Sequence, residues 1–423
     1  MRFSRGWMFG AAPIRVPYVN SSPHFYSWFF QSFYSKAAVS DALHFAKNVA
    51  FYTAPLFFIY SSSYLSAYIA LPVDSPESQG FDHYQAYPAL PFGNDKEKTD
   101  EEIRRLESVL VASDHKPDMF SIAEILSWSG DSYVEALSNE SVKYFILERC
   151  DAAEVPRYDV MANSVRQVAS QFNSGESPDR HLTHPKEFQF DHTQGPAEQQ
   201  TSFCAALSRW VYRDQCDSLS LLKSYPEFER YFDYQFGYLT PKKGVEAQGL
   251  AFLKAHVHEI KLNVQQVGID GTRHSVIQVL NAGLALGPYD FAREERTEAG
   301  NKIIAEMCAV VLKAQYEAVA AVAVREARIN PEKRIPLCLT LVGAGVFSND
   351  VDAVRNAISA ACDFVEKSGV NNIDVCLSAY QHSEAEIFST LHFRDAPVLD
   401  QATLSRLSKL SDYVAPLKNS MYP

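Results

Sequence analysis

Pro336-Leu-Cys-Leu-Thr-Leu-Val-Gly-Ala-Gly-Val-Phe-Ser-Asn-Asp350 is the stretch of sequence that decides the fold class. Its first half, Leu337 to Val342, is an apolar run without polar alternation, which is typical of a strand buried on both faces. The Gly-Ala-Gly that follows lets the chain turn sharply, and Asn349 or Asp350 can then cap a helix with an apolar face. This order is typical of a phosphate-binding loop, although an ordinary strand-to-helix connection has the same pattern.

Strands alternate with helices on both sides of this stretch. The patterns predict strands at 165–173, 260–267, 276–280 and 373–379, and helices at 196–212, 245–256, 297–327 and 382–391. Such alternation predicts an α/β fold in three layers, with helices on both faces of a mixed, largely parallel sheet. Ligands of such sheets bind at the carboxyl ends of the strands, where the glycine-containing loops lie.

The part of the chain before residue 150 is predicted to be a helical region. Residues 74–98 are rich in Pro, Gly, Ser, Tyr and Asp and resemble a linker, and Thr99-Asp-Glu-Glu opens a helix with a capping pattern. Further helical periods fall at 119–128 and 142–148. We therefore expect a targeting or membrane-associated segment (1–73), a linker and helical subdomain (74–150), the α/β domain (151–392), and a C-terminal helix and tail (393–423).

The first segment contains an uncharged stretch, residues 48–73, which is long enough to span a bilayer. Pro55, a serine triplet and four tyrosines reduce its apolar character. The first 40 residues also lack acidic side chains, as transit segments do. The sequence leaves open a membrane anchor, a targeting segment, a helix of the folded domain and disorder.

Composition excludes several classes of function. The net charge of -12 argues against a nucleic-acid-binding protein. Seven dispersed cysteines predict reduced thiols in a reducing compartment, such as the cytosol or the mitochondrial matrix. Residues 48–73 leave anchoring at a membrane open as an alternative. The pairs His181/His184 and His256/His258 lack companion ligands, so we expect no metal site and no cofactor.

Four motifs in order resemble a known family. They are Gln171-Phe-Asn173 at a strand end, Thr193-Gln-Gly-Pro196 before a helix, Gly343-Ala-Gly-Val-Phe-Ser-Asn349, and Ala379-Tyr380 after the last strand. Together they resemble the macrodomain superfamily, in its divergent branch near poly(ADP-ribose) glycohydrolases and MavL-type ADP-ribosyl hydrolases. The resemblance covers roughly residues 155–392 and implies a macrodomain-like sandwich.

The resemblance implies a role for each matched position. Asn173, with Gln171, would bind the terminal ribose, and Tyr380 would lie against adenine. The diphosphate would be bound by the first loop, Thr193, Gln194 and Gly195, and by the N–H groups of the second, Gly343, Ala344, Gly345, Val346, Phe347 and Asn349. The aromatic ring of Phe347 would close over the ribose. Each position also has a purely structural explanation: a turn asparagine, a helix cap, a core phenylalanine or an aromatic residue at a sheet end.

The catalytic residues are less clearly indicated, because the Gln-Glu-Glu run of the glycohydrolases is absent. Cleavage of an ADP-ribosyl bond needs a carboxylate near the distal ribose. Asp191 precedes the first loop and is the first candidate. Asp270 in a turn and Glu317 in a long helix are the others, and each can equally be a structural or solvated acid.

The sequence thus predicts a protein that binds ADP-ribose or ADP-ribosylated protein, with hydrolysis of the ADP-ribosyl bond as the favoured activity. Two alternatives remain open: a catalytically inactive ADP-ribose reader, and an unrelated α/β protein whose glycine loop binds another nucleotide or phosphate.

Overall fold

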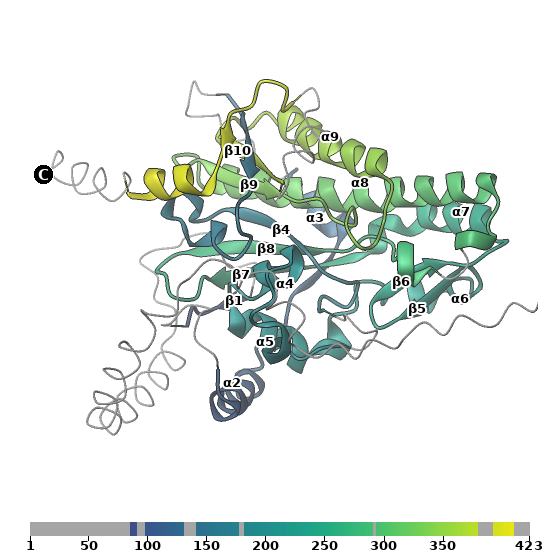
Figure 1. The fold of residues 1–423 in the computed structure, drawn as a ribbon, viewed down its shortest axis with the longest axis horizontal. Helices are drawn as coiled ribbons and strands as arrows, with labels where there is room; N and C mark the ends of the chain where they lie inside the picture. Colours follow the sequence, from purple (N-terminus) through teal and green to yellow (C-terminus); the bar gives the residue numbers. More distant parts are fainter. Residues whose placement is uncertain are drawn as a thin grey trace, which may run out of the picture. The chain divides into compact units, whose positions relative to one another are not determined.

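The computed structural model describes residues 85–90, 98–130, 141–176, 182–290, 293–379 and 392–409 (Figure 1). All of them belong to one compact unit that begins at Leu71. Some sequence predictions lie outside the described residues, namely the uncharged stretch 48–73, Tyr380 and the helix at 382–391.

A nine-stranded sheet has the order β1-β7-β8-β4-β9-β10-β3-β11, with β2 paired to β7. Its strands are β1 (Ala86–Tyr87), β2 (Met119–Ser121), β3 (Lys143–Glu148), β4 (Val165–Ala169), β7 (Lys261–Gly268), β8 (Ser275–Asn281), β9 (Ile335–Leu339), β10 (Ile373–Ala379) and β11 (Val398–Leu399). The neighbours from β8 to β11 along this order are parallel, whereas β7 pairs antiparallel with β8 and β2. The predicted mixed, largely parallel sheet is confirmed.

Helices cover both faces of this sheet (Figure 1). On one face α8 (Glu298–Ile329) contacts β4, β9 and β10, and α3 (Ile122–Trp128), α7 (Glu246–His256) and α9 (Val351–Lys367) pack beside it. On the other face α4 (Gln194–Gln199) contacts β4, and α5 (Phe203–Val211) packs against α4 and α2 (Asp100–Ala112). The three-layer arrangement predicted from the sequence is therefore confirmed.

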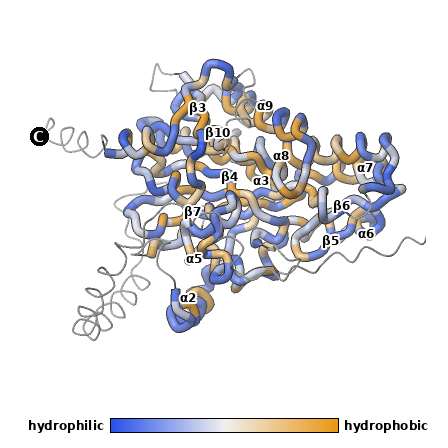
Figure 2. Tube along the Cα trace, viewed as in Figure 1, coloured by the Kyte–Doolittle hydropathy of each residue, from blue (hydrophilic) through white to orange (hydrophobic). Residues whose placement is uncertain are grey.

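The long helix α8 forms the centre of its layer. Thr297 caps it by accepting a hydrogen bond from the N–H of Gly300 at 3.1 Å. Among the described helices it alone has the length and apolar composition needed to cross a membrane, and 78% of its apolar window is buried inside the protein. Figure 2 shows hydrophobic residues along α8 and the neighbouring strands, so its apolarity is explained by packing in the core.

The structure corrects two predicted helices. Residues 143–148 form β3, paired with β10 in the central sheet, and residues 119–121 form β2 before the short helix α3. Both runs are rich in aromatic and β-branched residues, and the periodicity of such short runs does not separate strand from helix. Segments on both sides of residue 150 therefore contribute to one sheet.

The single helix predicted at 196–212 is two helices, α4 and α5, and Asp270 explains the break. The Asp270 carboxylate accepts hydrogen bonds from the N–H groups of Phe203 at 3.0 Å and of Leu90 at 2.8 Å. Its own N–H donates to Thr201 at 2.8 Å. Asp270 therefore caps α5 from a distant segment and joins three parts of the chain.

Asp270 lies in the turn between β7 and β8, at the amino end of β8. Because β8, β4 and β9 are parallel, this is the edge of the sheet opposite to the Gly343 loop. Its side chain is fully buried, and burial raises its pKa to about 7. A catalytic role for Asp270 stays a prediction, and its contacts account for it as a structural residue.

We expect Asp270→Ala to lower the free energy of unfolding by about 2–5 kcal/mol, because it orphans two buried N–H donors. Urea denaturation measures this change. The matched control is Glu332→Ala, which removes a carboxylate that is 62% exposed and should change stability by no more than about 0.5 kcal/mol. Unchanged stability of the Asp270 variant would contradict this structural account.

Candidate functional site

Two of the predicted motifs, and one further loop, follow strands that end at the same edge of the sheet. Parallel pairing brings together the carboxyl ends of β8, β4 and β9, after which come residues 282–284, 171–173 and 343–349. The connections after β8 and β9 touch, since a Cβ on Gly283 would lie 3.0 Å from the Cα of Gly343. These loops therefore form one surface at the edge where ligands of parallel sheets bind.

The buried amide of Asn349 holds two of these loops together. Its Nδ2 donates to the carbonyl of Leu284 at 2.7 Å, and its Oδ1 accepts from the N–H of Leu284 at 3.2 Å. Its own N–H closes the loop by donating to Gly343 at 2.9 Å. Gly343 has φ +79, which favours glycine. Asn349, predicted as a ligand-binding residue, thus has a structural position beneath the loop, while the helix cap is Asp350.

The middle of this loop exposes successive backbone donors. The N–H of Ser348 donates to Gly345 at 2.9 Å and closes a β-turn, in which neither Val346 nor Phe347 has a positive φ. No described residue accepts a hydrogen bond from the N–H groups of Gly345, Val346 or Phe347. The Val346 side chain is 60% exposed. A row of such donors at a tight turn can bind an anion.

Asn173 lies in a tight loop after β4, against the tip of the hairpin formed by β5 (Phe232–Gln235) and β6 (Tyr238–Pro241). Its Oδ1 accepts from the N–H of Gly175 at 3.1 Å, and its Nδ2 donates to the carbonyl of Phe236 at 3.1 Å. The approach is close: a Cβ on Gly237 would lie 2.6 Å from the Asn173 side chain. The Asn173 amide is thus held in one orientation but remains partly exposed.

Beneath this loop lies a buried acid that sequence reasoning missed, Glu176. Its carboxylate accepts from Nε2 of Gln171 at 3.1 Å and from Nε2 of Gln199 at 2.5 Å. Burial raises its pKa to about 8, although both glutamine donors act in the opposite direction. In a loop dense in Ser, Pro and Asp, a glutamate resembles an ordinary solvated residue, and no sequence signal marks it.

The buried polar chain continues into α5. The Oε1 of Gln199 accepts from Arg209 at 3.3 Å, and Arg209 also donates to Oε1 of Gln265 at 2.6 Å. Burial lowers the pKa of Arg209 to about 10. A cation within the otherwise apolar pattern of α5 was the one available sequence signal for this network. Arg209 thus places a positive charge on the other side of Gln199 from Glu176.

The first predicted loop approaches the same carboxylate. A Cβ on Gly195 would lie 2.8 Å from the carbonyl oxygen of Ala169 and 3.0 Å from Oε1 of Glu176. Only glycine therefore fits here without a shift. Thr193 is the N-cap residue of α4, and Gln194 begins that helix. The Thr193-Gln-Gly segment thus packs directly against the end of β4.

Asp191 is exposed at the start of this loop. One of its carboxylate oxygens accepts from both the N–H and the hydroxyl of Thr193, each at 2.7 Å. Asp191 also lines a cavity of about 510 Å³ together with His192 and Arg157. The second carboxylate oxygen makes no hydrogen bond with any described residue. Asp191 is therefore a solvent-accessible carboxylate at the start of the first loop.

Among the described residues, Glu317 makes no hydrogen bond or ion pair to the motif loops. It forms an ion pair with Lys313 at 3.8 Å along α8, and its side chain is partly exposed. Burial raises its pKa, with Lys313 and His258 acting in the opposite direction. Its neighbours in sequence, Gln315 and Tyr316, bond to the chain after β8 and β9. A catalytic role for Glu317 stays a prediction that these contacts do not favour.

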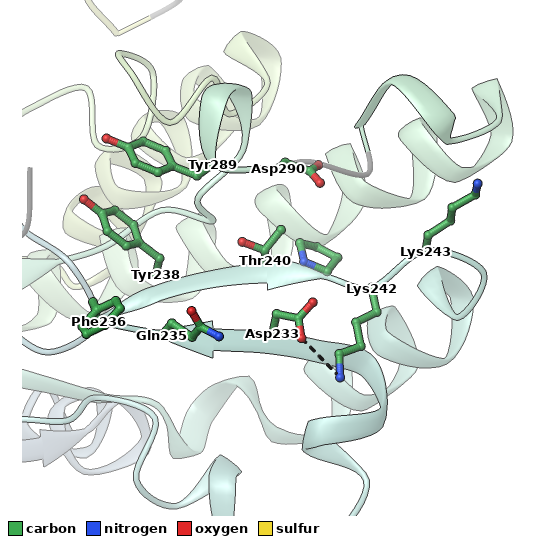
Figure 3. Close-up of a pocket in the computed structure, with 10 residues that line it drawn as sticks. Asp233, Gln235, Phe236, Tyr238, Thr240, Lys242, Lys243, Tyr289 and Asp290 are labelled. Atoms are coloured by element: carbon green, nitrogen blue, oxygen red, sulfur yellow. Dashed lines mark ion pairs between the residues drawn. The ribbon is translucent and has the colours of Figure 1, made fainter. Parts of the chain in front are cut away.

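An aromatic cluster borders the second loop. Tyr238 and Tyr289 are stacked with ring centroids 4.6 Å apart, and Phe347 meets their edges at 5.6 and 5.7 Å. The two tyrosines also line a cavity of about 300 Å³ beside the hairpin (Figure 3). Phe347 is therefore packed from the loop into this cluster, and the cavity adjoins the candidate site.

The cysteines form no disulfide, and the possible metal ligands lie apart from this site. All seven cysteines are free thiols. Among the described residues, Asp363, Glu366 and His392 bring one possible ligand atom each within 4.8 Å of one another on the outer side of α9. Exposed acidic groups often cluster without a metal, and the predicted absence of a metal site stays a prediction.

Comparisons with known proteins find similarity to solved structures. No family model and no curated protein matches the chain. The poly(ADP-ribose) glycohydrolase of Thermomonospora curvata is similar at 14% identity and a TM-score of 0.35, over 69% of this chain and 88% of that chain. The glycohydrolase of Deinococcus radiodurans in complex with ADP-ribose has 13% identity and a TM-score of 0.33, over 66% and 95%. A macrodomain of Trypanosoma brucei has 12% identity and a TM-score of 0.29, over 71% and 97%. Both classes that the motifs resemble are thus among the similar structures, and the fold assignment rests on the sheet topology itself.

The raised pKa of Glu176 predicts a loss of stability as pH increases. The unfolded carboxyl titrates near 4.5 and the folded one near 8, so the folded state binds the proton more tightly. The stabilisation is complete below the unfolded pKa and is lost as pH rises through the folded pKa, with a slope of up to about 1.4 kcal/mol per pH unit. We expect urea midpoints to fall between about pH 5 and pH 8.

The matched variant is Glu176→Gln, which has a similar shape and does not titrate. It should reduce the slope of unfolding free energy against pH by up to one proton, while the contribution of Asp270 remains. If the wild type and the variant had the same slope, Glu176 would not titrate in this range.

Proposed function

We propose that this protein binds ADP-ribose at the carboxyl edge of its sheet and hydrolyses the bond that joins ADP-ribose to a modified protein. The observation that carries the proposal is the meeting of the three motif loops in one chain of contacts. Gly195 packs on Glu176, the loop of Asn173 follows, and the hairpin beside Asn173 reaches Phe347. Unrelated glycine turns would have no reason to meet in this way.

The second loop supplies donors suited to a diphosphate. The N–H groups of Gly345, Val346 and Phe347 have no acceptor among the described residues and belong to an exposed turn. Charge-assisted hydrogen bonds from backbone N–H groups to phosphate oxygens are about twice as strong as neutral ones. The loop is already held in shape by Asn349, so binding requires little further ordering.

Asn173 has the chemistry needed for the distal ribose. Each end of its amide uses one hydrogen bond, to Gly175 and to Phe236. An amide oxygen has a second lone pair and an amide nitrogen a second hydrogen. In a vicinal pair of sugar hydroxyls, one can accept from this N–H and the other can donate to the amide oxygen. The existing bonds then serve to fix the orientation of the amide.

Asp191 is the proposed catalytic carboxylate. In hydrolysis, the bond between the anomeric carbon of the distal ribose and the protein heteroatom breaks, and its electron pair leaves with the heteroatom. A water oxygen bonds to the carbon, one water proton passes to the base, and the leaving group gains a proton. The unbonded oxygen of Asp191 can orient the water and accept that proton.

The alternative from another class is an ADP-ribose reader without catalysis. The observation that favours it is the double hydrogen bond from Thr193 to Asp191, which a purely structural turn would also have. Binding and hydrolysis therefore need separate tests.

Binding is tested by Val346→Pro, with Val346→Ala as the matched control. Val346 is the second residue of the turn closed by Ser348, a position that accepts proline. Proline removes one proposed donor to phosphate, whereas alanine keeps it. We expect calorimetric titration with ADP-ribose to show about 10–100-fold weaker binding by the proline variant, as for one charged hydrogen bond, and unchanged binding by the alanine variant.

The same titration separates ADP-ribose binding from generic phosphate binding. ADP-ribose should bind more tightly than ADP or inorganic phosphate, because only ADP-ribose reaches Asn173. Equal affinities for ADP-ribose and ADP would contradict the ribose contact, and no saturable binding of ADP-ribose would refute the proposal.

Hydrolysis is tested by Asp191→Asn. The amide oxygen can accept both hydrogen bonds from Thr193, so the loop keeps its shape, but the amide is not a base. We expect release of ADP-ribose from Arg-, Glu- or Ser-modified protein to fall by about 10²–10⁴-fold, with affinity for ADP-ribose within a few-fold of the wild type. Full turnover by this variant would show that another group is the base. Absence of release by the wild type would favour the reader.

A further inference from the structure

The hairpin beside Asn173 has an unusual tip. Its strands, β5 (Phe232–Gln235) and β6 (Tyr238–Pro241), are joined by Phe236 and Gly237, which have φ +53 and +84. Two central residues with positive φ form a type I′ turn, in which Asn or Asp usually precedes glycine. A bulky aromatic residue with positive φ is strained. Phe236 is nevertheless 49% exposed, so packing inside the protein does not explain it.

The tip is fixed against the predicted ribose-binding residue. The carbonyl of Phe236 accepts from Asn173, and the N–H of Phe172 donates to the carbonyl of Gly237 at 3.0 Å. The Cβ-free face of Gly237 lies directly on Asn173. The backbone that carries the Phe236 ring is therefore fixed next to the place where the distal ribose would bind.

Behind this ring lies the cavity of about 300 Å³ shown in Figure 3. The stacked rings of Tyr238 and Tyr289 form part of its lining, and Phe347 contacts both of them. Phe347, in the loop that would bind the diphosphate, thus packs against two residues of the cavity lining. A group attached to the distal ribose can reach this cavity without leaving the surface of the protein.

The charges around the cavity do not suit a polyanion. Lys242 lies 3.3 Å from Asp233, and Lys243 lies 3.0 Å from Glu295. Both lysines that line the cavity are thus paired with carboxylates, in a chain of net charge -12. Aromatic side chains with a few polar groups are instead the usual composition of surfaces that bind polypeptides.

We infer that this cavity is an acceptor subsite, which binds the polypeptide that carries the ADP-ribose next to the modified side chain. Phe236 and the Tyr238–Tyr289 pair contact the polypeptide, while Asn173 and the Gly345–Phe347 turn hold the ADP-ribose. The inference rests on the proposed binding of ADP-ribose and adds the part of the substrate that lies beyond the distal ribose. It makes the protein selective for modified protein over free ADP-ribose.

The test uses Phe236→Asn in the full-length protein. Asparagine removes the ring but is favoured at this position of a type I′ turn, so the hairpin and the carbonyl that accepts from Asn173 are preserved. The control is Val111→Asn, which replaces a side chain that is 58% exposed on α2. The probes are free ADP-ribose, a synthetic peptide carrying one ADP-ribose through a non-hydrolysable linkage, the unmodified peptide, and a short poly(ADP-ribose) chain.

We expect the wild type to bind the conjugate about five- to tenfold more tightly than free ADP-ribose, as for one or two aromatic contacts. Phe236→Asn should remove this advantage and leave the affinity for free ADP-ribose unchanged, and Val111→Asn should change neither. Equal wild-type affinities for conjugate and free ADP-ribose would overturn the inference while leaving the proposed function intact.

Other outcomes also decide the matter. Weaker binding of both ligands by Phe236→Asn would assign the ring to the ADP-ribose site rather than to an acceptor. A Phe236-dependent preference for the poly(ADP-ribose) chain over the peptide conjugate would overturn the polypeptide assignment. If the wild type bound none of the ADP-ribose probes, the proposed function and the inference would both fail.

Discussion

The hydrogen bonds between the Asn349 amide and the backbone of Leu284 are the constraint on which the candidate site depends. They tie the loop after β9 to the chain after β8, at the edge where the parallel strands end. A buried amide with both ends paired has no competing water and therefore holds one conformation. These hydrogen bonds also hold the turn from Gly345 to Ser348 in place. Its free N–H groups are thereby fixed in direction before any ligand arrives, which is the condition under which backbone dipoles bind charge effectively.

A second constraint, the buried charges of Glu176 and Arg209, lies below the loop of Asn173, and it lowers the stability of the folded state. Burial of Glu176 and Arg209 removes both from water, and neither contacts the other directly; Gln199 lies between them. An arrangement of this kind gains little folding free energy compared with an apolar core. The arrangement instead positions the two loops, because Glu176 packs under Gly195 and next to the loop of Asn173. Deprotonation of Glu176 lowers the free energy of unfolding at neutral pH, whereas its contacts hold the two loops against each other.

The parts of the fold that follow local pattern could be predicted from the sequence. The strands β7, β8, β9 and β10 and the helices α7, α8 and α9 were each predicted close to their observed bounds from apolar runs and from turn or capping residues near their ends. The errors arose where contacts with distant residues determine the structure. Asp270 caps the start of α5, and pairing with β10 makes residues 143–148 a strand. The same limit applies to the site. Motif loops were visible as glycine, asparagine and threonine patterns, whereas Glu176, Phe236 and Tyr289 gain their positions only from contacts with segments far away in the sequence.

The overall charge bears on how such a site can select its ligand. A chain with a net charge of -12 repels anions at long range. A site built from paired lysines and neutral backbone donors does not offset this repulsion at a distance, because N–H dipoles act only over a short range. An isolated diphosphate can still bind once it is within hydrogen-bond reach of the turn. A long polyanion would extend beyond the turn into the negative field of the protein. For the ADP-ribose site that we propose, the charge of the chain therefore favours one ADP-ribose unit on a neutral or basic carrier over a polymer of many units.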